Sequence, residues 1–89
     1  MSNKLKTFWL SFCDTDLPEG QKFLGCVITR ACTIVMALEK AHILGINPGG
    51  EVGFIEVPKK FASHIHENDY DKLMSKEYLL AREYIDNEA

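Results

Sequence analysis

A glycine-rich turn is the first segment of this chain whose residue types suggest ligand chemistry. In Asn47-Pro48-Gly49-Gly50-Glu51, consecutive glycines can free backbone N–H groups to surround an anion. The turn follows a predicted helix end, where the helix dipole is negative, and it lacks the Lys-Ser/Thr ending of a phosphate-binding loop. The alternative is a helix stop and tight turn that needs glycine for its backbone angles. The sequence leaves both interpretations open.

The second segment of this kind is His64-Ile65-His66-Glu67. Alternate histidines on an extended segment project to the same side and can share a metal ion. No further ligand stands at a recognisable zinc spacing, so we predict a solvated polar loop, with no metal and no cofactor. The loop Asp14-Thr15-Asp16 has too few ligands for a calcium site, and we predict a plain turn there.

Residues for catalysis are poorly arranged. Glu51 and Glu56 stand five residues apart on one predicted strand, so they face opposite sides and cannot act on one bond. No G-x-S-x-G motif is present, and no serine has an ordered base beside it. We therefore predict no catalytic residues and favour a non-enzymatic function.

The chain contains three cysteines, Cys13, Cys26 and Cys32. Their number is odd, they form no C-x-x-C pair, and each lies in or beside an apolar run, so we predict three reduced and buried thiols. A catalytic cysteine paired with His42 or His64 is the alternative.

Three strands are predicted, at 6–13, 23–29 and 51–57. In the first, apolar and aromatic residues alternate: Phe8, Leu10 and Phe12 face one way, and Trp9 faces the other. A strand residue such as Trp9 either packs under a helix or lines a ligand or partner surface. The turn-rich segment 14–21 between the first two strands predicts an antiparallel hairpin. Pro58 ends the third strand.

Two helices are predicted. The first begins at the N-cap Thr33, runs to about Leu44 and stops at Gly45 in the C′ position. The second spans about 69–85, and Ser75 is an alternative N-cap that would divide it. We read the stretch 59–68 between the third strand and this helix as an irregular connection or a short turn of helix.

The order β-β-α-β-α predicts one α+β domain over residues 1–89. We expect a small two-layer sandwich: a three-stranded sheet with the helices on one face. The third strand follows the first helix and could lie parallel to the second strand through a right-handed crossover, although the pairing is not fixed. Exposed sheet edges favour a homo-oligomer.

Composition excludes several functions. The net charge of −3 argues against general nucleic-acid binding, which needs a surplus of lysine and arginine. We find no secretory leader and no apolar run of the roughly 20 residues that a membrane span requires, so we expect a cytoplasmic protein that does not enter membranes.

Three runs give the chain a resemblance to a group of small uncharacterised proteins encoded by bacteriophages, prophages and their hosts. They are FWLSF at 8–12, GQKFLG at 20–25 and GINPGGEV at 45–52, within the first two-thirds of the chain. The resemblance implies a role as an anti-defence factor in the cytoplasm of a host cell. The resemblance suggests a biological context for this chain but implies no mechanism.

Two functional hypotheses follow. The first is an oligomeric, non-enzymatic protein that binds and sequesters a small polar ligand, of the nucleotide signalling type, to counter host defence. The residues predicted to bind it are Trp9, Gln21, Lys22, Asn47, Gly49, Gly50 and Glu51. The second is a protein-interaction module that inhibits a host protein by direct binding through a sheet edge or the tyrosine-rich helix.

Overall fold

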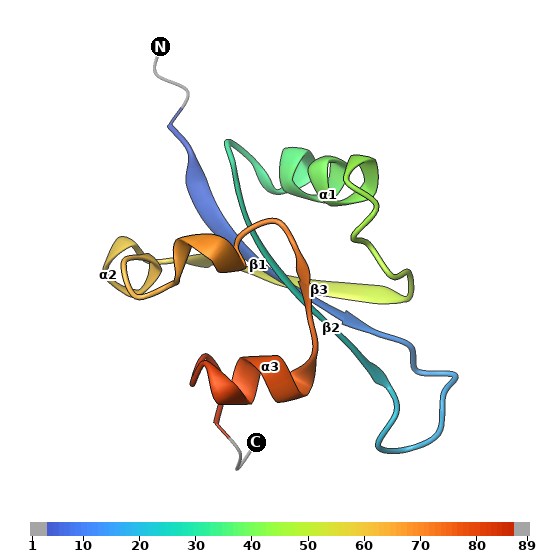
Figure 1. Ribbon diagram of the computed structural model, residues 1–89. Coiled ribbons are helices and arrows are strands. Elements are labelled where there is room, and N and C mark those ends of the chain that lie inside the picture. The colour runs from blue at the N-terminus through green and yellow to red at the C-terminus, as the bar shows by residue number, and fades with distance from the viewer. Residues whose placement is uncertain (1–3, 87–89) are drawn as a thin grey trace.

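The protein is an α+β domain built on a four-stranded antiparallel sheet with strand order β3-β1-β2-β4 (Figure 1). A computed structural model describes residues 4–86. The strands are β1 (Lys6–Cys13), β2 (Phe23–Ala31), β3 (Glu51–Val57) and β4 (Leu73–Met74). The helices are α1 (Ile34–Ile43), α2 (Lys59–Ala62), the 3-10 helix η1 (Glu67–Asp69) and α3 (Lys76–Ala81). Within the described residues, no helix is both long and apolar enough to cross a membrane.

The predicted hairpin of β1 and β2 is confirmed. The two strands pair antiparallel from Lys6 opposite Ala31 to Cys13 opposite Phe23, with a register shift after Phe12. The alternation read from the sequence holds along β1, because Phe8, Leu10 and Phe12 are buried while the residues between them are half-buried.

Strand β3 lies beside β1, on the side away from β2. It pairs antiparallel with β1, from Thr7 opposite Val57 to Cys13 opposite Glu51. Since β2 and β3 are both antiparallel to β1, they run in the same direction with β1 between them. The sequence left this pairing open, and a direct parallel pairing with β2 does not occur.

Helix α1 covers one face of the sheet and encloses the first core. Thr33 caps its N-terminus by accepting a hydrogen bond from the Met36 N–H, as predicted. Gly45 follows its end with φ +73°, a left-handed angle that suits glycine. The small side chains of Ala37 and Ala41 bring the helix close to the sheet. This core consists of Phe8, Leu10, Phe12, Val27, Ala31, Ala37 and Ala41.

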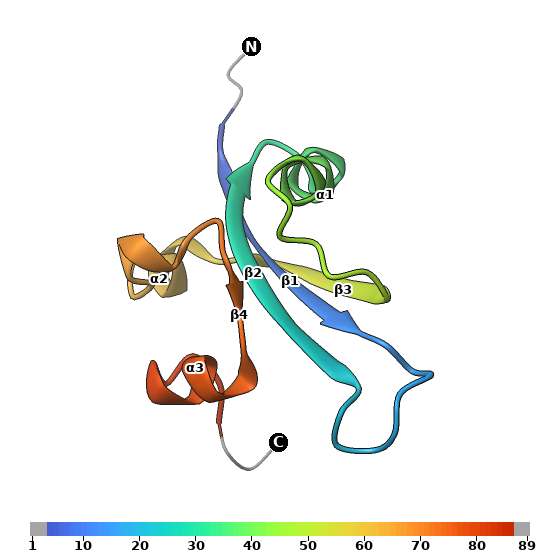
Figure 2. The same cartoon turned by 45° about the vertical axis from the view of Figure 1, so that its right-hand side comes forward.

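The prediction that the helices share one face in two layers is wrong. The segment that holds α2 and α3 packs on the opposite face from α1, so the sheet is covered on both sides (Figure 2). The second core consists of Cys26, Ile28, Met74 and Leu79, with Trp9 packed against it. The physical reason is that β2 carries apolar residues on both faces, with Trp9 of β1 beside them on the second face, and both faces must be removed from water.

The predicted helix over 69–85 is also wrong in most of its length. Asp71 takes a left-handed φ of +62°, and Leu73–Met74 then form β4 against Cys26 and Val27. The alternative start at Ser75 is correct, because its hydroxyl accepts from the Tyr78 N–H and begins α3. The sheet therefore has four strands, one more than predicted, and residues 70–75 form no helix.

The cysteines are free thiols, but only Cys26 is buried, whereas Cys13 and Cys32 are half-buried. Burial raises the pKa of the Cys26 thiol to about 11, although side-chain hydrogen bonds with Ser11 and Trp9 oppose the effect. This thiol is a packing group and not an activated nucleophile.

Candidate functional site

Most of the residues predicted to bind a ligand meet at one end of the sheet. There the Asp14 N–H donates to the Lys22 carbonyl at 2.8 Å and closes the β1–β2 loop, and Gly50 of the glycine turn lies against Cys13 at the start of that loop. The Thr15 hydroxyl donates to Glu51 at 3.4 Å. The structure thus brings the loop that holds Gln21 and Lys22 together with the turn 47–51.

Close backbone approach accounts for the glycine turn. A Cβ atom on Gly50 would lie 2.3 Å from the Cys13 carbonyl oxygen, which no side chain tolerates. The Gly49 N–H donates to the Asn47 side-chain oxygen at 2.8 Å, so one of the two N–H groups expected to hold an anion is already bonded.

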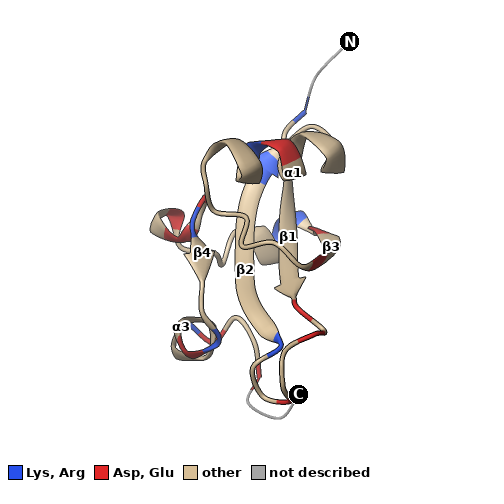
Figure 3. Ribbon diagram, turned by 90° about the vertical axis from the view of Figure 1, so that its right-hand side faces the viewer, with Lys and Arg blue, Asp and Glu red and all other residues tan. Residues whose placement is uncertain are grey.

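The charge at this end of the sheet is mostly negative. Asp14, Asp16 and Glu19 follow β1 in the loop, and Glu51 lies beside them, as the red ribbon of the loop in Figure 3 shows. The Lys22 ammonium lies 3.0 Å from the Glu19 carboxylate. An anion at the turn would therefore meet an excess of carboxylates.

Trp9 stands apart from these residues. It lies four positions before Cys13 on β1, which is about 13 Å at 3.3 Å per residue. Its neighbours across the sheet are Ile28 on β2 and Ile55 on β3. The side chain faces the C-terminal segment and not α1.

A groove of about 290 Å³ opens beside this side chain, and we call it the Trp9 groove. Its walls come from β1, β3, α2 and the end of the chain that follows α3. The residues that line it include Trp9, Ile55, Phe61, His64, Glu83 and Tyr84. Aromatic rings from distant parts of the sequence thus converge on an apolar depression with a few polar groups, the usual composition of a small-ligand site.

Hydrogen bonds through its hydroxyl fix the Tyr84 ring in the wall of the groove. The Tyr84 hydroxyl donates to Asp69 at 2.6 Å and accepts from the His66 N–H at 2.8 Å. Burial and the bond to Asp69 raise the pKa of Tyr84. The ring face is therefore presented in one orientation, while the hydroxyl is already bonded.

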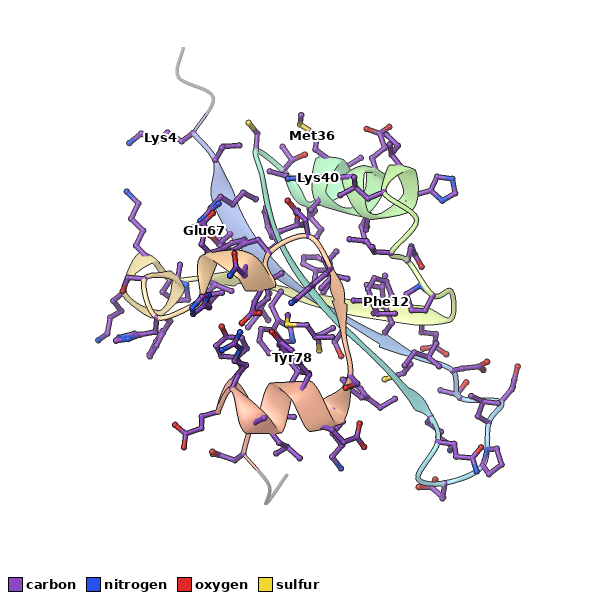
Figure 4. All side chains as sticks on the ribbon, viewed as in Figure 1. Lys4, Phe12, Met36, Lys40, Glu67 and Tyr78 are labelled. Atoms are coloured by element: carbon purple, nitrogen blue, oxygen red, sulfur yellow. The ribbon has the colours of Figure 1, made fainter. Side chains whose placement is uncertain are left out.

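Asp69 is the centre of this arrangement and is completely buried. Its carboxylate accepts from Tyr78 at 2.5 Å, lies 2.9 Å from Arg82 Nε and lies 3.4 Å from the Lys72 ammonium. Figure 4 shows Tyr78 pointing from α3 toward the sheet. Burial alone would raise the pKa of Asp69, but bonds from Tyr78, Tyr84 and Lys72 and the charge of Arg82 lower it to about 2. Asp69 is an ionised anchor for the groove wall.

Arg30 makes a second anchor, between β2 and η1. Its guanidinium donates twice to Glu67, at 3.0 Å each, and lies 3.8 Å from the centre of the Tyr70 ring. This pair lowers the pKa of Glu67 through the hydrogen bond from Arg30. Lys40 on α1 donates to the Arg30 carbonyl at 3.1 Å. The contacts of Arg30 with Glu67 and Tyr70 hold the segment after α2 against the sheet, and the Lys40 bond joins α1 to β2.

The two histidines of the predicted polar loop have separate environments. His64 lines the Trp9 groove, whereas the His66 ring accepts a long bond from the Asn68 N–H at 3.5 Å. Among residues 4–86, no group of three or more histidine, cysteine, aspartate or glutamate side chains could hold a metal ion. Glu51 and Glu56 pair with Cys13 and Phe8 of β1, which puts them on opposite faces of the sheet.

The sequence pointed to Trp9 but not to the residues that surround it. Phe61 lies in the stretch read as an irregular connection, and Tyr84 lies in the predicted helix. The usable signal in the sequence was an aromatic residue, Phe61, soon after the proline that ends β3 and followed by His64.

Fold and site together define a small antiparallel α+β domain with an aromatic groove at one edge of its sheet. Comparisons with protein-family models, with curated proteins and with solved structures found no match.

Proposed function

We propose that this protein is a non-enzymatic binder that sequesters a small nucleotide-type ligand in the Trp9 groove. The observation that carries the proposal is the convergence of Trp9, Phe61 and Tyr84 on one groove. Every nucleobase has a flat face, and stacking on an aromatic side chain contributes about 1–3 kcal/mol per base. Phe61 is 57% exposed, so its ring is accessible to such a ligand.

The rim of the groove supplies the polar contacts that a nucleotide needs. The Lys60 ammonium lies 5.6 Å from the centre of the Phe61 ring, and His64 lines the groove nearby. Both can attract a phosphate attached to a stacked base. Glu83, which also lines the groove, can accept hydrogen bonds from amino or hydroxyl groups. The resemblance to phage proteins extends the proposal to a role: removal of such a signal would counter a host defence.

The only tryptophan of the chain lies in the groove and makes the test direct. We expect its fluorescence to change in a saturable way with AMP, GMP or a cyclic dinucleotide, and not with ribose 5-phosphate, which lacks a base. Phe61→Ala should weaken binding about tenfold, equal to the loss of roughly 1.4 kcal/mol of stacking. Met36→Ala, on the outer side of α1 (Figure 4), is the matched control and should bind normally.

Recovery of chemically unchanged nucleotide after incubation would agree with binding without catalysis. Failure of every nucleotide to change the fluorescence, or equal affinity of Phe61→Ala and the unmodified protein, would refute the proposal.

The second candidate function is inhibition of a host protein by direct binding, and the outer side of α1 favours it. Val35, Met36, Ile43 and Leu44 are all exposed there, and Leu5 lies in the same depression as the last three. Contiguous apolar side chains on a surface are typical of protein-binding sites.

If this surface binds a host protein, Ile43→Lys should abolish co-purification of that protein from host lysate, while Phe61→Ala should not. Equal recovery with both variants would exclude this surface.

A further inference from the structure

Within residues 4–86, strand β3 forms an edge of the sheet with no further strand beside it. It is the terminal strand in the order β3-β1-β2-β4, and it spans seven residues without a register shift against β1. Natural edge strands are usually short, bulged, or interrupted by proline or lysine, because a free edge pairs with other strands. The opposite edge, β4, has only two residues. The β4 edge is thus protected because it is short, whereas the longer β3 edge is open.

Both faces of β3 carry exposed apolar side chains. Val52 and Phe54 lie, with Glu56, on the face that α1 only partly covers. Ile55 lies on the face of the Trp9 groove with 60% of its surface exposed. A small ligand in the groove would cover one face alone. A further strand beside β3 would bond the free backbone groups and bury apolar side chains on both faces.

The charges at the two ends of β3 identify the strand that fits. Glu51 begins the strand, and Lys59 and Lys60 follow its end in α2. An antiparallel copy of the same segment brings Glu51 of each chain toward the lysines of the other, twice by symmetry. A parallel copy would bring like charges together. The segment is therefore complementary to itself in the antiparallel direction.

We propose that β3 pairs with β3 of a second copy of this chain, about a twofold axis perpendicular to the sheet. The two sheets then become one, and both Trp9 grooves lie on the same face beside the seam. Residues opposite each other in antiparallel strands share a face, so Ile55 of the second copy flanks the open side of the groove. This last step rests on the proposed function, whereas the pairing of the strands does not.

Sedimentation velocity without ligand tests the pairing. The unmodified protein should be a dimer, and Ile55→Lys should be monomeric with an unchanged circular dichroism spectrum. Ile43→Lys is the matched control, because Ile43 is 77% exposed on α1, and it should remain a dimer. A monomeric unmodified protein, or a dimer broken by Ile43→Lys and not by Ile55→Lys, would overturn the proposal.

A second test of the pairing reverses the charges at the two ends of β3 and does not depend on the folding of Ile55→Lys. Glu51→Lys and the double variant Lys59→Glu, Lys60→Glu should each dimerise at least tenfold more weakly, because their segments repel their own copies. Mixed together, the two variants should form a heterodimer, and the absence of one would contradict the pairing. Ligand binding by a monomer would refute only this inference, and a dimer that binds no nucleotide would refute only the proposed function.

Discussion

Replacement of Asp69 by asparagine is expected to lower the free energy of unfolding by about 3 kcal/mol, since breaking a buried charged network is among the costliest single changes. The carboxylate accepts hydrogen bonds from Tyr78 and Tyr84 and faces Arg82 at 2.9 Å. An asparagine amide would turn a donor toward donors and leave Arg82 without its partner. Urea denaturation at pH 7 measures the effect. Asp16→Asn, in the exposed β1–β2 loop, should change stability by less than about 0.5 kcal/mol.

The pH dependence of stability gives the same prediction a second readout. The pKa of Asp69 is about 2 in the folded protein, below the ordinary value of 3.8. A carboxyl group whose pKa is lowered by folding stabilises the fold above its unfolded value and loses that contribution as the pH falls toward the folded value. The unmodified protein should therefore lose stability between about pH 4 and pH 2. Asp69→Asn should lack this part of the loss, and an identical acid profile for both proteins would contradict the role of Asp69.

The same substitution links the fold to the proposed function. Tyr84 holds its ring in the groove wall through the bond to Asp69, so Asp69→Asn should also weaken nucleotide binding under conditions in which the variant remains folded. A destabilised variant that binds with full affinity would show that the orientation of Tyr84 is not important for the ligand.

Local signals in the sequence were sufficient for several elements. The bounds of β1 and β3 follow from the alternation 6–13 and from Pro58 after 57. The N-cap Thr33 and the turn at Gly45 place α1 close to its observed bounds. Each of these depends on residues that are close together in the chain.

Unlike the β1–β2 hairpin, the pairing of strands that are distant in the sequence could not be predicted in the same way. The position of β3 beside β1 and the short strand β4 depend on contacts between distant segments, and no residue in Leu73–Met74 marks a strand by itself. The Trp9 groove has the same origin. Its aromatic walls come from β1, from α2 and from the segment after α3, so only the folded chain brings Trp9, Phe61 and Tyr84 together.

Gly50→Ala is expected to have the second large effect, a loss of about 3 kcal/mol in the free energy of unfolding. The φ angle of Gly50 is +75°, which costs an L-residue about 1–2 kcal/mol. The new Cβ would also lie 2.3 Å from the Cys13 carbonyl oxygen, so the turn or the end of β1 must move, at a further cost of about 1–3 kcal/mol. Thermal and urea denaturation, followed by circular dichroism, measure the loss.

Gly49→Ala separates these two contributions. Gly49 has a φ of +92°, but a Cβ there would meet nothing within 4 Å. The Gly49 variant should therefore lose only the conformational part, about 1–2 kcal/mol, and the difference from Gly50→Ala measures the close approach to Cys13. Equal losses in both variants would contradict this explanation. Unchanged nucleotide binding by Gly49→Ala would show that the turn has only a structural role. Loss of binding in this variant, while it remains folded, would show that the ligand binds at the glycine turn and not beside Trp9.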